Sequence, residues 1–304
     1  MPSLSNDDKE GVFMALSYED LKKNHPCFAQ GAKSNKGRVH LPVSPGCNIF
    51  CNFCKRDINE NENRPGVAKA IISAEEAVEL VRKALALCPD ITVVGVAGPG
   101  DSLASPYALE TFRMIKEAFP HVIKCMSTNG LLLPQYADEI IELGIDSLTV
   151  TVNAVDPVIQ SKICEAIVYQ GKRYTGTKAA EILIHNQLTG IKQVSQAGIT
   201  VKVNTVLIPE INGDHIKEVA KTVAEHGAKI YNIIPLIPQH KLSWCSVPTC
   251  HQLSRARAEA EEYIQVFRHC QRCRADAAGI PGGKDVSQQL YLRPIQFENN
   301  FSHG

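Results

Sequence analysis

Short apolar runs of strand length alternate along this chain with amphipathic runs of helix length, and this alternation restricts the fold more than any other feature. Such alternation is typical of repeated strand–helix units around a parallel sheet. The predicted strands cover residues 38–44, 91–97, 122–127, 147–152, 200–206 and 230–235. The predicted helices between and after them cover residues 74–87, 106–118, 134–142, 178–197 and 214–226. The chain is therefore predicted to be an α/β protein.

The sequence of the turn after the first predicted strand distinguishes between two kinds of parallel α/β fold. It lacks the Gly-x-Gly-x-x-Gly pattern of dinucleotide-binding sheets, so a barrel is favoured. Both a partial (β/α)6-type barrel and a full (β/α)8-like barrel agree with six strand–helix units. The fold class is predicted to be one of these two barrels.

The alternation of side chains within the strands indicates a polar interior. In the fourth strand, Leu148 and Val150 share one face while Thr149 lies on the other. In the fifth strand, the same alternation separates Lys202 from Val203. An apolar face toward the helices and a polar face toward the lumen is what a barrel with an interior site needs.

Composition changes along the chain divide it into three predicted segments. Residues 1–37 are polar and form a predicted N-terminal extension, and residues 38–240 form the barrel. Residues 241–304 form a cysteine-containing tail with a charged helix over 251–268, which we interpret as a lid rather than a seventh unit.

The charge balance and the cysteine count restrict the class of protein. Thirty-two basic and thirty-two acidic residues cancel, so the chain lacks the broad basic surface that attracts nucleic acid or anionic membranes. No apolar run approaches the roughly 20 residues of a membrane helix, and we expect a cytoplasmic protein. Eleven cysteines in a reducing compartment point to metal ligation or thiol chemistry.

Three cysteines, Cys47, Cys51 and Cys54, form a C-x3-C-x2-C motif directly after the first predicted strand. Barrel active sites are built at this end of the strands. Zinc sites use four ligands and usually two C-x2-C pairs, whereas three thiolates on a [4Fe-4S] cluster leave one iron without a protein ligand. A structural zinc knuckle and a cluster with only a redox role are the alternatives.

This motif in this place resembles that of the radical S-adenosylmethionine (SAM) superfamily. The resemblance implies that SAM chelates the open iron and is cleaved to a 5'-deoxyadenosyl radical. It also implies SAM contacts at the ends of the next strands, where a simple turn or cap is the alternative reading. The implied SAM-binding residues are Gly98, Gly100, Asp101, Ser127, Thr128, Asn129, Thr151 and Asn153.

A narrower resemblance rests on further motifs spread over most of residues 20–285. They read HPCF, VSPGCNIFCNFC, ENRPGV, AGPGD, STNG and HCQRCRADAAG. Together they resemble the radical SAM family that makes the precursor of the nitrogenase iron–molybdenum cofactor. That resemblance implies fusion of two [4Fe-4S] clusters with a SAM-derived carbide and a sulfide. It also implies an iron–sulfur cluster donor, an electron donor and a downstream cofactor carrier or scaffold as partner proteins.

The same resemblance assigns ligands for the two substrate clusters. Cys27, His40 and Cys125 would hold one cluster, and Cys270 with Cys273 would hold the other. Cys27 lies in a polar segment and is not explained as core, and strand alternation turns His40 inward. Ligand sets with fewer than four cysteines suit clusters that must react and then leave.

The ENRPGV motif contains two candidate catalytic residues, Glu62 and Arg64. They could manage protons or hydrogen-bond to cluster sulfides, and a solvated polar loop is the alternative reading.

The chain also departs from this family. Family members often carry further cysteines where this chain has KRDINENEN and Ala260. His25, Cys245 and Cys250 stay open as additional ligands, and Cys164 is interpreted as structural.

Two other functions agree with these motifs. One is a radical SAM enzyme that modifies a peptide or small molecule and uses the tail cysteines for an auxiliary cluster. The other is a non-catalytic iron–sulfur carrier, which would not cleave SAM.

Overall fold

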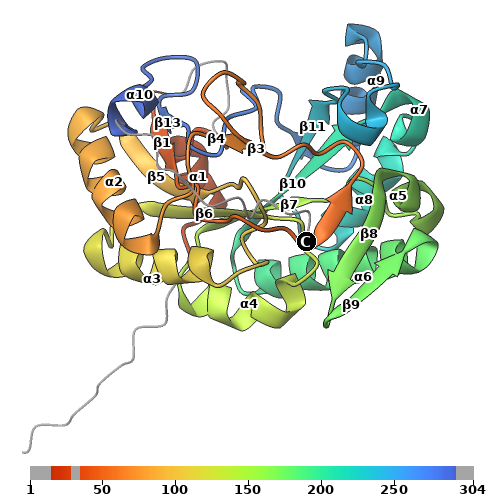
Figure 1. The fold of residues 1–304 in the computed structure, drawn as a ribbon. Coiled ribbons are helices and arrows are strands. Elements are labelled where there is room, and N and C mark those ends of the chain that lie inside the picture. The colour runs from red at the N-terminus through yellow and green to blue at the C-terminus, as the bar shows by residue number, and fades with distance from the viewer. Residues whose placement is uncertain (1–14, 29–34, 292–304) are drawn as a thin grey trace, which may run out of the picture.

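The structure is a computed structural model that describes residues 15–28 and 35–291. Its centre is an eight-stranded sheet that contains all six predicted strands (Figure 1). In sheet order the strands are β12 (Gln265–Val266), β11 (Ile230–Pro235), β10 (Thr200–Leu207), β7 (Ser147–Thr151), β6 (Ile123–Thr128), β5 (Ile91–Val96), β1 (Gly37–His40) and β13 (Ala278–Gly279). Neighbouring strands are parallel except for β13, which runs antiparallel to β1.

The sheet is an open, partial barrel. Among the described residues its two edges are β12 and β13, which lie at opposite ends of the strand order. Of the two predicted barrels the partial form is therefore correct and the closed (β/α)8-like form is wrong. Two smaller sheets lie outside it, one of β2 (Ile49–Cys51), β8 (Cys164–Tyr169) and β9 (Lys172–Thr175), the other of β3 (Asp57–Ile58) and β4 (Val67–Ala68).

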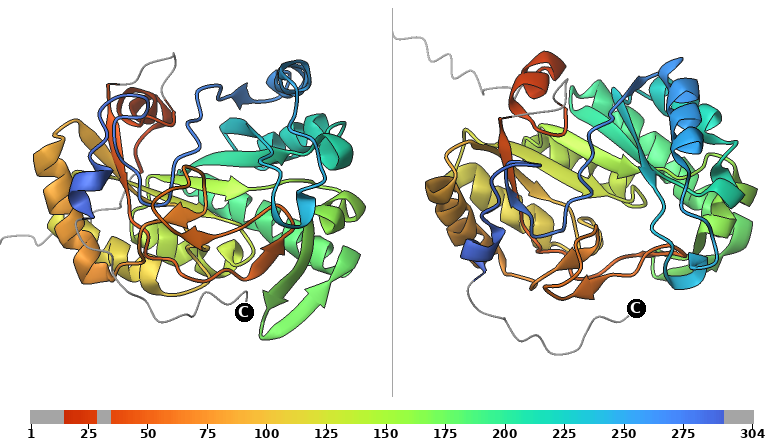
Figure 2. Two further views of the ribbon diagram at one scale, coloured as in Figure 1. Left: turned by 45° about the horizontal axis from the view of Figure 1, so that its top comes forward. Right: turned by 90° about the horizontal axis from the view of Figure 1, so that it is seen from above.

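The longer helices form an outer layer around the curved sheet (Figure 2). They are α2 (Ala74–Leu87), α3 (Tyr107–Ala118), α4 (Leu133–Glu142), α5 (Pro157–Ile163), α6 (Gly176–Gln196), α8 (Ile216–Glu225) and α9 (Cys250–Glu261). The other helices of the described residues are α1 (Tyr18–Asn24) and the short α7 (Pro209–Asn212), α10 (Ser287–Leu290) and 3-10 helix His240–Leu242. Helix α2 begins where its sequence predicts, because Ser73 and Glu76 cap each other's backbone N–H groups.

Helix α9 is shorter than the prediction of 251–268. It ends at Glu261, and the chain then turns so that β12 joins the sheet beside β11. Ile264 and Val266 enter the main core, and the N–H of Phe267 donates to the carbonyl oxygen of Tyr231 at 2.8 Å. Burial of these apolar side chains favours the turn over further helix.

The inner face of β6 shows how the barrel interior is layered. Ile123, at its start, packs with Leu21 of α1, which covers the end of the barrel where the strands begin. Cys125 follows one layer further along, and Ser127 lines a cavity at the opposite end. The outward-facing Met126 belongs to the main core. The predicted polar interior thus contains two separate layers of candidate functional side chains.

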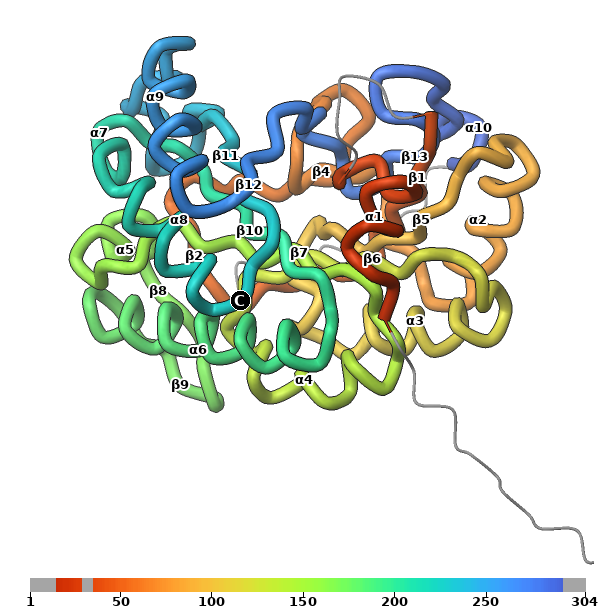
Figure 3. Tube along the Cα trace, turned by 180° about the vertical axis from the view of Figure 1, so that it is seen from behind, coloured from red at the N-terminus to blue at the C-terminus, as the bar shows by residue number. Residues whose placement is uncertain are grey.

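The C-terminal tail contributes to the same sheet as the barrel. After α9 it forms β12, passes the β3–β4 loop and pairs with β1 through β13 (Figure 3). The N–H of Ala275 donates to the carbonyl oxygen of Val67 at 2.9 Å, and Tyr18 donates to Gln265 at 2.6 Å. The predicted segment boundaries stay predictions, and residues 1–14, 29–34 and 292–304 lie outside the described part.

Within the described residues, no helix has both the length and the apolar character required to cross a membrane.

Candidate active site

A cavity of about 510 Å³ opens at the C-terminal ends of the strands. Ligand sites typically measure ~300–1,000 Å³. The three motif cysteines line it together with seven of the eight predicted SAM-binding residues: Cys47, Cys51, Cys54, Gly100, Asp101, Ser127, Thr128, Asn129, Thr151 and Asn153. Gly98 does not line it, and an added Cβ there would contact Ala275 of the tail at 3.6 Å. The structure therefore brings the motif and most of the predicted contacts to one site.

The cysteine loop is held by the hairpin of β8 and β9, which the sequence did not predict. Cys51 of β2 pairs with Cys164 of β8 in an antiparallel ladder, and the N–H of Asn52 donates to the carbonyl oxygen of Ile163. The N–H of Cys54 donates to the carbonyl oxygen of Cys51 at 3.1 Å, which closes a turn between the two thiols. The hairpin thus fixes where the motif faces the cavity.

The thiols of the motif are protonated at neutral pH when they bind nothing. Burial raises the pKa of Cys47 to about 12 and also raises the pKa of Cys54. A side-chain hydrogen bond with Cys164, followed by burial, raises the pKa of Cys51. Cys164, interpreted from the sequence as structural, therefore lies directly beside the motif. Because metals bind the thiolate form, loading this site must release protons.

The turn after β5 is pinned against the start of the cysteine loop. The N–H of Gly100 donates to the carbonyl oxygen of Ser44 and the N–H of Asp101 to that of Gly46, both at 2.7 Å. The buried Asp101 carboxylate accepts from the N–H of Leu103 at 2.9 Å and from the Thr128 hydroxyl at 3.1 Å. Burial raises the pKa of Asp101 against these hydrogen bonds. Asp101 thereby joins two strand ends around the cavity.

We expect Gly100→Ala to damage this site, because an added Cβ would lie 1.9 Å from the carbonyl oxygen of Gly46 and 2.8 Å from that of Ser44. Backbone atoms cannot rotate away, and overpacking of this kind costs about 1–3 kcal/mol. Urea unfolding should show that loss of stability, and equilibrium dialysis should show weaker SAM binding. Gly46→Ala is the matched control, since its Cβ would have nothing within 4 Å. Equal behaviour of the two variants would contradict the close approach.

Amide side chains surround the cavity and order one another. Asn129 donates to the Asn48 side chain at 2.7 Å and lies 3.7 Å from the Cys47 sulfur. Gln187 of α6 donates to the carbonyl oxygens of Asn129 and Thr151, both at 2.8 Å. Sequence reasoning missed Gln187, although a buried amide on the apolar side of a helix is a signal that it could have used.

The β8–β9 hairpin adds charged residues to the cavity wall that the sequence analysis also missed. Glu165 and Arg173 line the cavity, and Glu165 forms an ion pair with Lys241. The Arg173 guanidinium lies 4.5 Å from the centre of the Phe50 ring. These contacts give the cavity both signs of charge at its rim.

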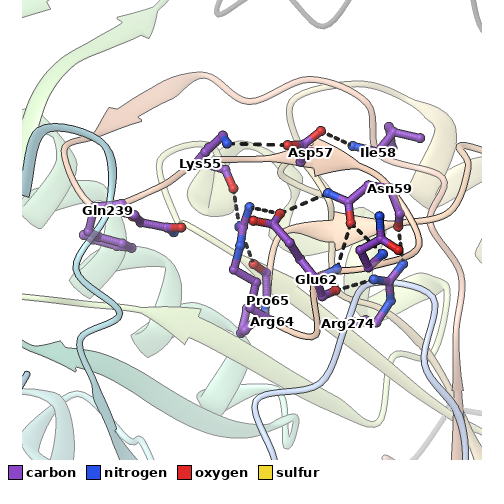
Figure 4. A network of polar contacts seen from close by, with 11 residues as sticks. Lys55, Asp57, Ile58, Asn59, Glu62, Arg64, Pro65, Gln239 and Arg274 are labelled. Carbon is purple, nitrogen blue, oxygen red and sulfur yellow. Dashed lines mark hydrogen bonds and ion pairs between the residues drawn. The ribbon is translucent and has the colours of Figure 1, made fainter. Parts of the chain in front are cut away.

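The loop after the cysteine motif is fastened to the C-terminal tail (Figure 4). Arg274 donates to the carbonyl oxygens of Asn59, at 2.8 Å, and Glu62. The Glu62 carboxylate accepts from Asn59 at 3.0 Å and Arg64 at 2.7 Å, and these two contacts lower its pKa. Arg64 also donates to the carbonyl oxygen of Lys55. Glu62 and Arg64 are not among the residues that line the cavity.

A second group of thiols occupies the layer of the barrel below the cavity, and we call Cys27, Cys125, Cys270 and Cys273 the inner cysteine cluster. Cys27, Cys125 and Cys270 pack against an apolar group that includes Phe28 and Phe267. Cys273 lies close enough to Cys27 to raise its pKa. The structure thus brings together thiols that were predicted for two separate substrate clusters.

Basic residues lie beside the inner cysteine cluster. The Arg38 guanidinium donates to the Cys273 sulfur at 3.0 Å. Burial raises the pKa of Cys27 to about 11, although Lys202 opposes this shift. Burial lowers the pKa of Lys202, but the four thiols together raise it more, so the net shift is upward. The inner cysteine cluster is therefore an electropositive environment.

His40 lies in a position suited to ligation. Its Nδ1 lies 3.1 Å from the carbonyl oxygen of Arg274, and since a carbonyl only accepts, Nδ1 donates and Nε2 keeps its lone pair. Burial, with Arg38 nearby, lowers the pKa of His40 to about 4, so the ring is neutral at pH 7. Gly95, on the adjacent strand β5, leaves room for the His40 ring, because an added Cβ there would lie 3.3 Å from the ring. Metal-bound histidines typically show this backbone-anchored arrangement.

The three additional ligands that the sequence left open lie in three different surroundings. His25 is buried, with its Nε2 lacking a hydrogen-bond partner. Cys245 belongs to a separate apolar cluster, and Cys250 is exposed at the start of α9. Within the described ranges no three His, Cys, Asp or Glu side chains are close enough to hold a single metal ion. The ligands of a cubane cluster each bind a different iron, so they spread around it instead of meeting at one point.

The donor set around the cavity fits an iron–sulfur cluster. Three soft thiols lie on one loop, and the wall opposite them is made of amide, hydroxyl and carboxylate groups. Thiolates are the preferred ligands of such clusters, and three of them leave one iron for a small molecule.

Comparisons with known proteins agree with this geometry. The sequence profile of the radical SAM superfamily matches residues 41–223. A radical SAM methyltransferase from Sphaerobacter thermophilus matches with a TM-score of 0.56 at 18% identity, over 76% of this chain and 65% of that chain. SuiB from Streptococcus suis, solved with bound S-adenosylmethionine, matches with a TM-score of 0.54 at 13% identity, over 82% and 52%. The two solved structures show a shared fold.

The fold and the cavity thus define a radical SAM enzyme, and that class implies one [4Fe-4S] cluster and SAM as cofactors. The chain is 45% identical over 284 residues to the FeMo cofactor biosynthesis protein NifB of Methanocaldococcus infernus, covering 93% of this chain and 94% of that protein. The NifB of Bradyrhizobium diazoefficiens is 44% identical over 86% of this chain but 54% of its own length. The chain belongs to the NifB family.

Proposed function

We propose that this enzyme makes the eight-iron precursor of the nitrogenase iron–molybdenum cofactor by fusing two [4Fe-4S] substrate clusters with a carbide and a sulfide. The observation that carries the proposal is the presence, in one barrel, of a three-cysteine cavity and a separate inner group of four thiols beside a neutral histidine. NifB relatives that match 93% and 90% of this chain support it. One SAM would donate a methyl group as the carbon source and leave as S-adenosylhomocysteine, and a second would supply the 5'-deoxyadenosyl radical, which takes a hydrogen atom from that methyl group and leaves as 5'-deoxyadenosine.

In this proposal Cys47, Cys51 and Cys54 hold the SAM-binding cluster. When bound, that cluster supplies the electron that cleaves SAM to a 5'-deoxyadenosyl radical. The chain's own residues orient SAM from the opposite wall of the cavity. The residues proposed to do so are Gly100, Asp101, Ser127, Thr128, Asn129, Thr151 and Asn153, and Gly98 is proposed to contribute through the turn that carries Gly100.

The substrate clusters are assigned to the inner layer. Cys27, His40 and Cys125 hold one cluster, and Cys270 with Cys273 hold the other. The low pKa of His40 supports its role, because only neutral imidazole binds iron. Incomplete cysteine ligation also suits a product that must leave the protein.

Glu62 and Arg64 are proposed to manage protons or to hydrogen-bond with cluster sulfides. This proposal is supported by their place in the structure. Both residues stiffen the loop that connects the segment after Cys54 to the tail that carries Cys273. The lowered pKa of Glu62 keeps its carboxylate ionised but weakly basic, so a hydrogen bond to a cluster sulfide would come from the Arg64 guanidinium.

Protein partners follow from the chemistry of the proposed reaction. The enzyme needs an iron–sulfur cluster donor and an electron donor, and a downstream carrier or scaffold must receive its product.

An anaerobic reconstitution tests the proposal. The protein is loaded with ferrous iron and sulfide and its iron is counted, and SAM and dithionite are then added. We expect about twelve irons per chain, as three cubanes would give. Both 5'-deoxyadenosine and S-adenosylhomocysteine should appear, because radical formation and methyl donation are separate uses of SAM.

Two other outcomes would replace the proposal. About four irons with 5'-deoxyadenosine alone would indicate a radical SAM enzyme acting on a peptide or small molecule. Bound iron without either product would indicate a non-catalytic iron–sulfur carrier.

A further inference from the structure

Lys202 is a buried lysine surrounded by thiols and aromatic rings. It is 7% exposed, and its ammonium lies 5.6 Å from the centre of the Phe28 ring and 5.8 Å from that of Phe267. The same apolar group contacts three members of the inner cysteine cluster. In residues 15–28 and 35–291, no ion pair joins Lys202 to a carboxylate. Its charge is therefore buried without the usual partner.

A second buried lysine of the sheet shows the usual solution. Lys124 is 4% exposed, and its ammonium lies 3.6 Å from the carboxylate of Asp146. An isolated buried ammonium is costly, so proteins normally pair it with an anion. Aromatic faces at more than 5 Å supply only a small part of that compensation. The neighbouring thiols raise the pKa of Lys202 as thiolates, so we expect the anion at Lys202 to arrive when these thiols ionise to bind a cluster.

Arg38, a second cation beside the inner cysteine cluster, is already engaged. Arg38 donates to the carbonyl oxygen of Gly279 at 2.7 Å and to the Cys273 sulfur at 3.0 Å. These bonds fix the guanidinium at the edge of the sheet where β1 meets β13. Lys202, on β10, faces the cluster from another wall of the barrel, and its ammonium has three donors for acceptors such as thiolate and sulfide.

We propose that Lys202 is the counter-charge that retains an anionic iron–sulfur substrate at the inner cysteine cluster, an inference that rests on the proposed function. An iron–sulfur core held by thiolates carries net negative charge, so it needs compensation in a buried site. Loading the substrate supplies the anion that Lys202 lacks, and release of the product removes it. Lys202 is thus a substrate-binding residue rather than a structural one.

Lys202→Met and Lys202→Arg, with Lys124→Met as matched control, test this role. Each protein is reconstituted anaerobically with ferrous iron and sulfide, and its iron content and its iron loss to a chelator are measured. We expect Lys202→Met to lose about four to eight of about twelve irons, and to release the rest of its inner iron about tenfold faster. Lys202→Arg should keep most of the iron. The folded fraction of Lys124→Met should bind as much iron per chain as the parent does.

Thermal unfolding of the metal-free proteins separates binding from structure. Removing an uncompensated buried charge should leave the melting temperature of Lys202→Met equal to or above that of the parent. A structural lysine would instead lower it, as we expect for Lys124→Met, whose Asp146 loses its partner. Should Lys202→Met fail to fold, Lys202→Gln provides the same comparison.

The outcomes distinguish this inference from the proposed function. Parent-like iron content and iron loss in Lys202→Met, with a parent that binds about twelve irons and makes both products, would overturn only the role of Lys202. Equal iron loss in Lys124→Met would also overturn it, because the effect would then be general loosening. A parent that binds about four irons would remove the proposed function and this inference together.

Discussion

Cys51→Ala is expected to abolish SAM cleavage while iron stays bound at the inner cysteine cluster. Cys51 is the central thiol of the motif, and its strand fixes the loop by pairing with β8. Changes to groups that merely support a metal ligand already cost about 10–100-fold, so loss of a ligand should exceed 100-fold. Anaerobic assay of 5'-deoxyadenosine, with iron counted in the same sample, measures both effects.

Cys250→Ala is the control for that experiment. Cys250 is exposed at the start of α9, and it lines neither the cavity nor the inner layer. Its replacement should leave iron content and SAM cleavage at parent values. Retained 5'-deoxyadenosine formation in Cys51→Ala would remove the radical mechanism from this motif.

Local sequence patterns predicted most of the barrel. All six predicted strands exist because each is a short apolar run whose alternation agrees with a sheet buried on its outer face. Helix α2 agrees with its prediction because its capping box lies within four residues. Features that depend on neighbours in sequence are therefore well predicted.

Features that depend on distant contacts were predicted less well. The sequence from 251 to 268 continues a helical pattern. However, α9 ends at Glu261, because Ile264 and Val266 pack into the main core. The β8–β9 hairpin follows α5 directly, and its two-residue turn, Gln170-Gly171, lacks the Asn-Gly or Asp-Gly pair that most strongly marks such turns, so its two cavity residues, Glu165 and Arg173, were missed.

The candidate site likewise contains residues that the sequence could predict and contacts that it could not. Residues at the ends of predicted strands, such as Asp101 and Asn153, line one cavity because parallel strands bring their ends together. The contacts of Lys202 could not be predicted, since they require the tail to return through β13 and bring Cys270 inward. Strand alternation turned Lys202 toward the lumen but could not show that it lacks a carboxylate.

The double variant Cys270→Ala/Cys273→Ala is expected to lower the iron content by about one cubane and to stop product formation. Both thiols lie on the tail that runs beside the ENRPGV loop, and Cys270 contacts the same apolar group as Cys27 and Cys125. With one substrate cluster missing there is nothing to fuse, so the S-adenosylhomocysteine that methyl donation leaves behind should fall together with the product. Iron counting and product analysis after anaerobic reconstitution measure these effects.

Tail packing must be separated from ligation in that experiment. Arg274 and β13 hold the tail independently of the two thiols, so the metal-free double variant should unfold only slightly below the parent's temperature, because it loses the Arg38 contact to Cys273 and the packing of Cys270. The SAM-binding motif is held by β2 and β8, which the tail cysteines do not enter, so Cys47, Cys51 and Cys54 should still hold their cluster. An iron count equal to the parent's would make Cys270 and Cys273 packing residues, and the second substrate cluster would then need other ligands.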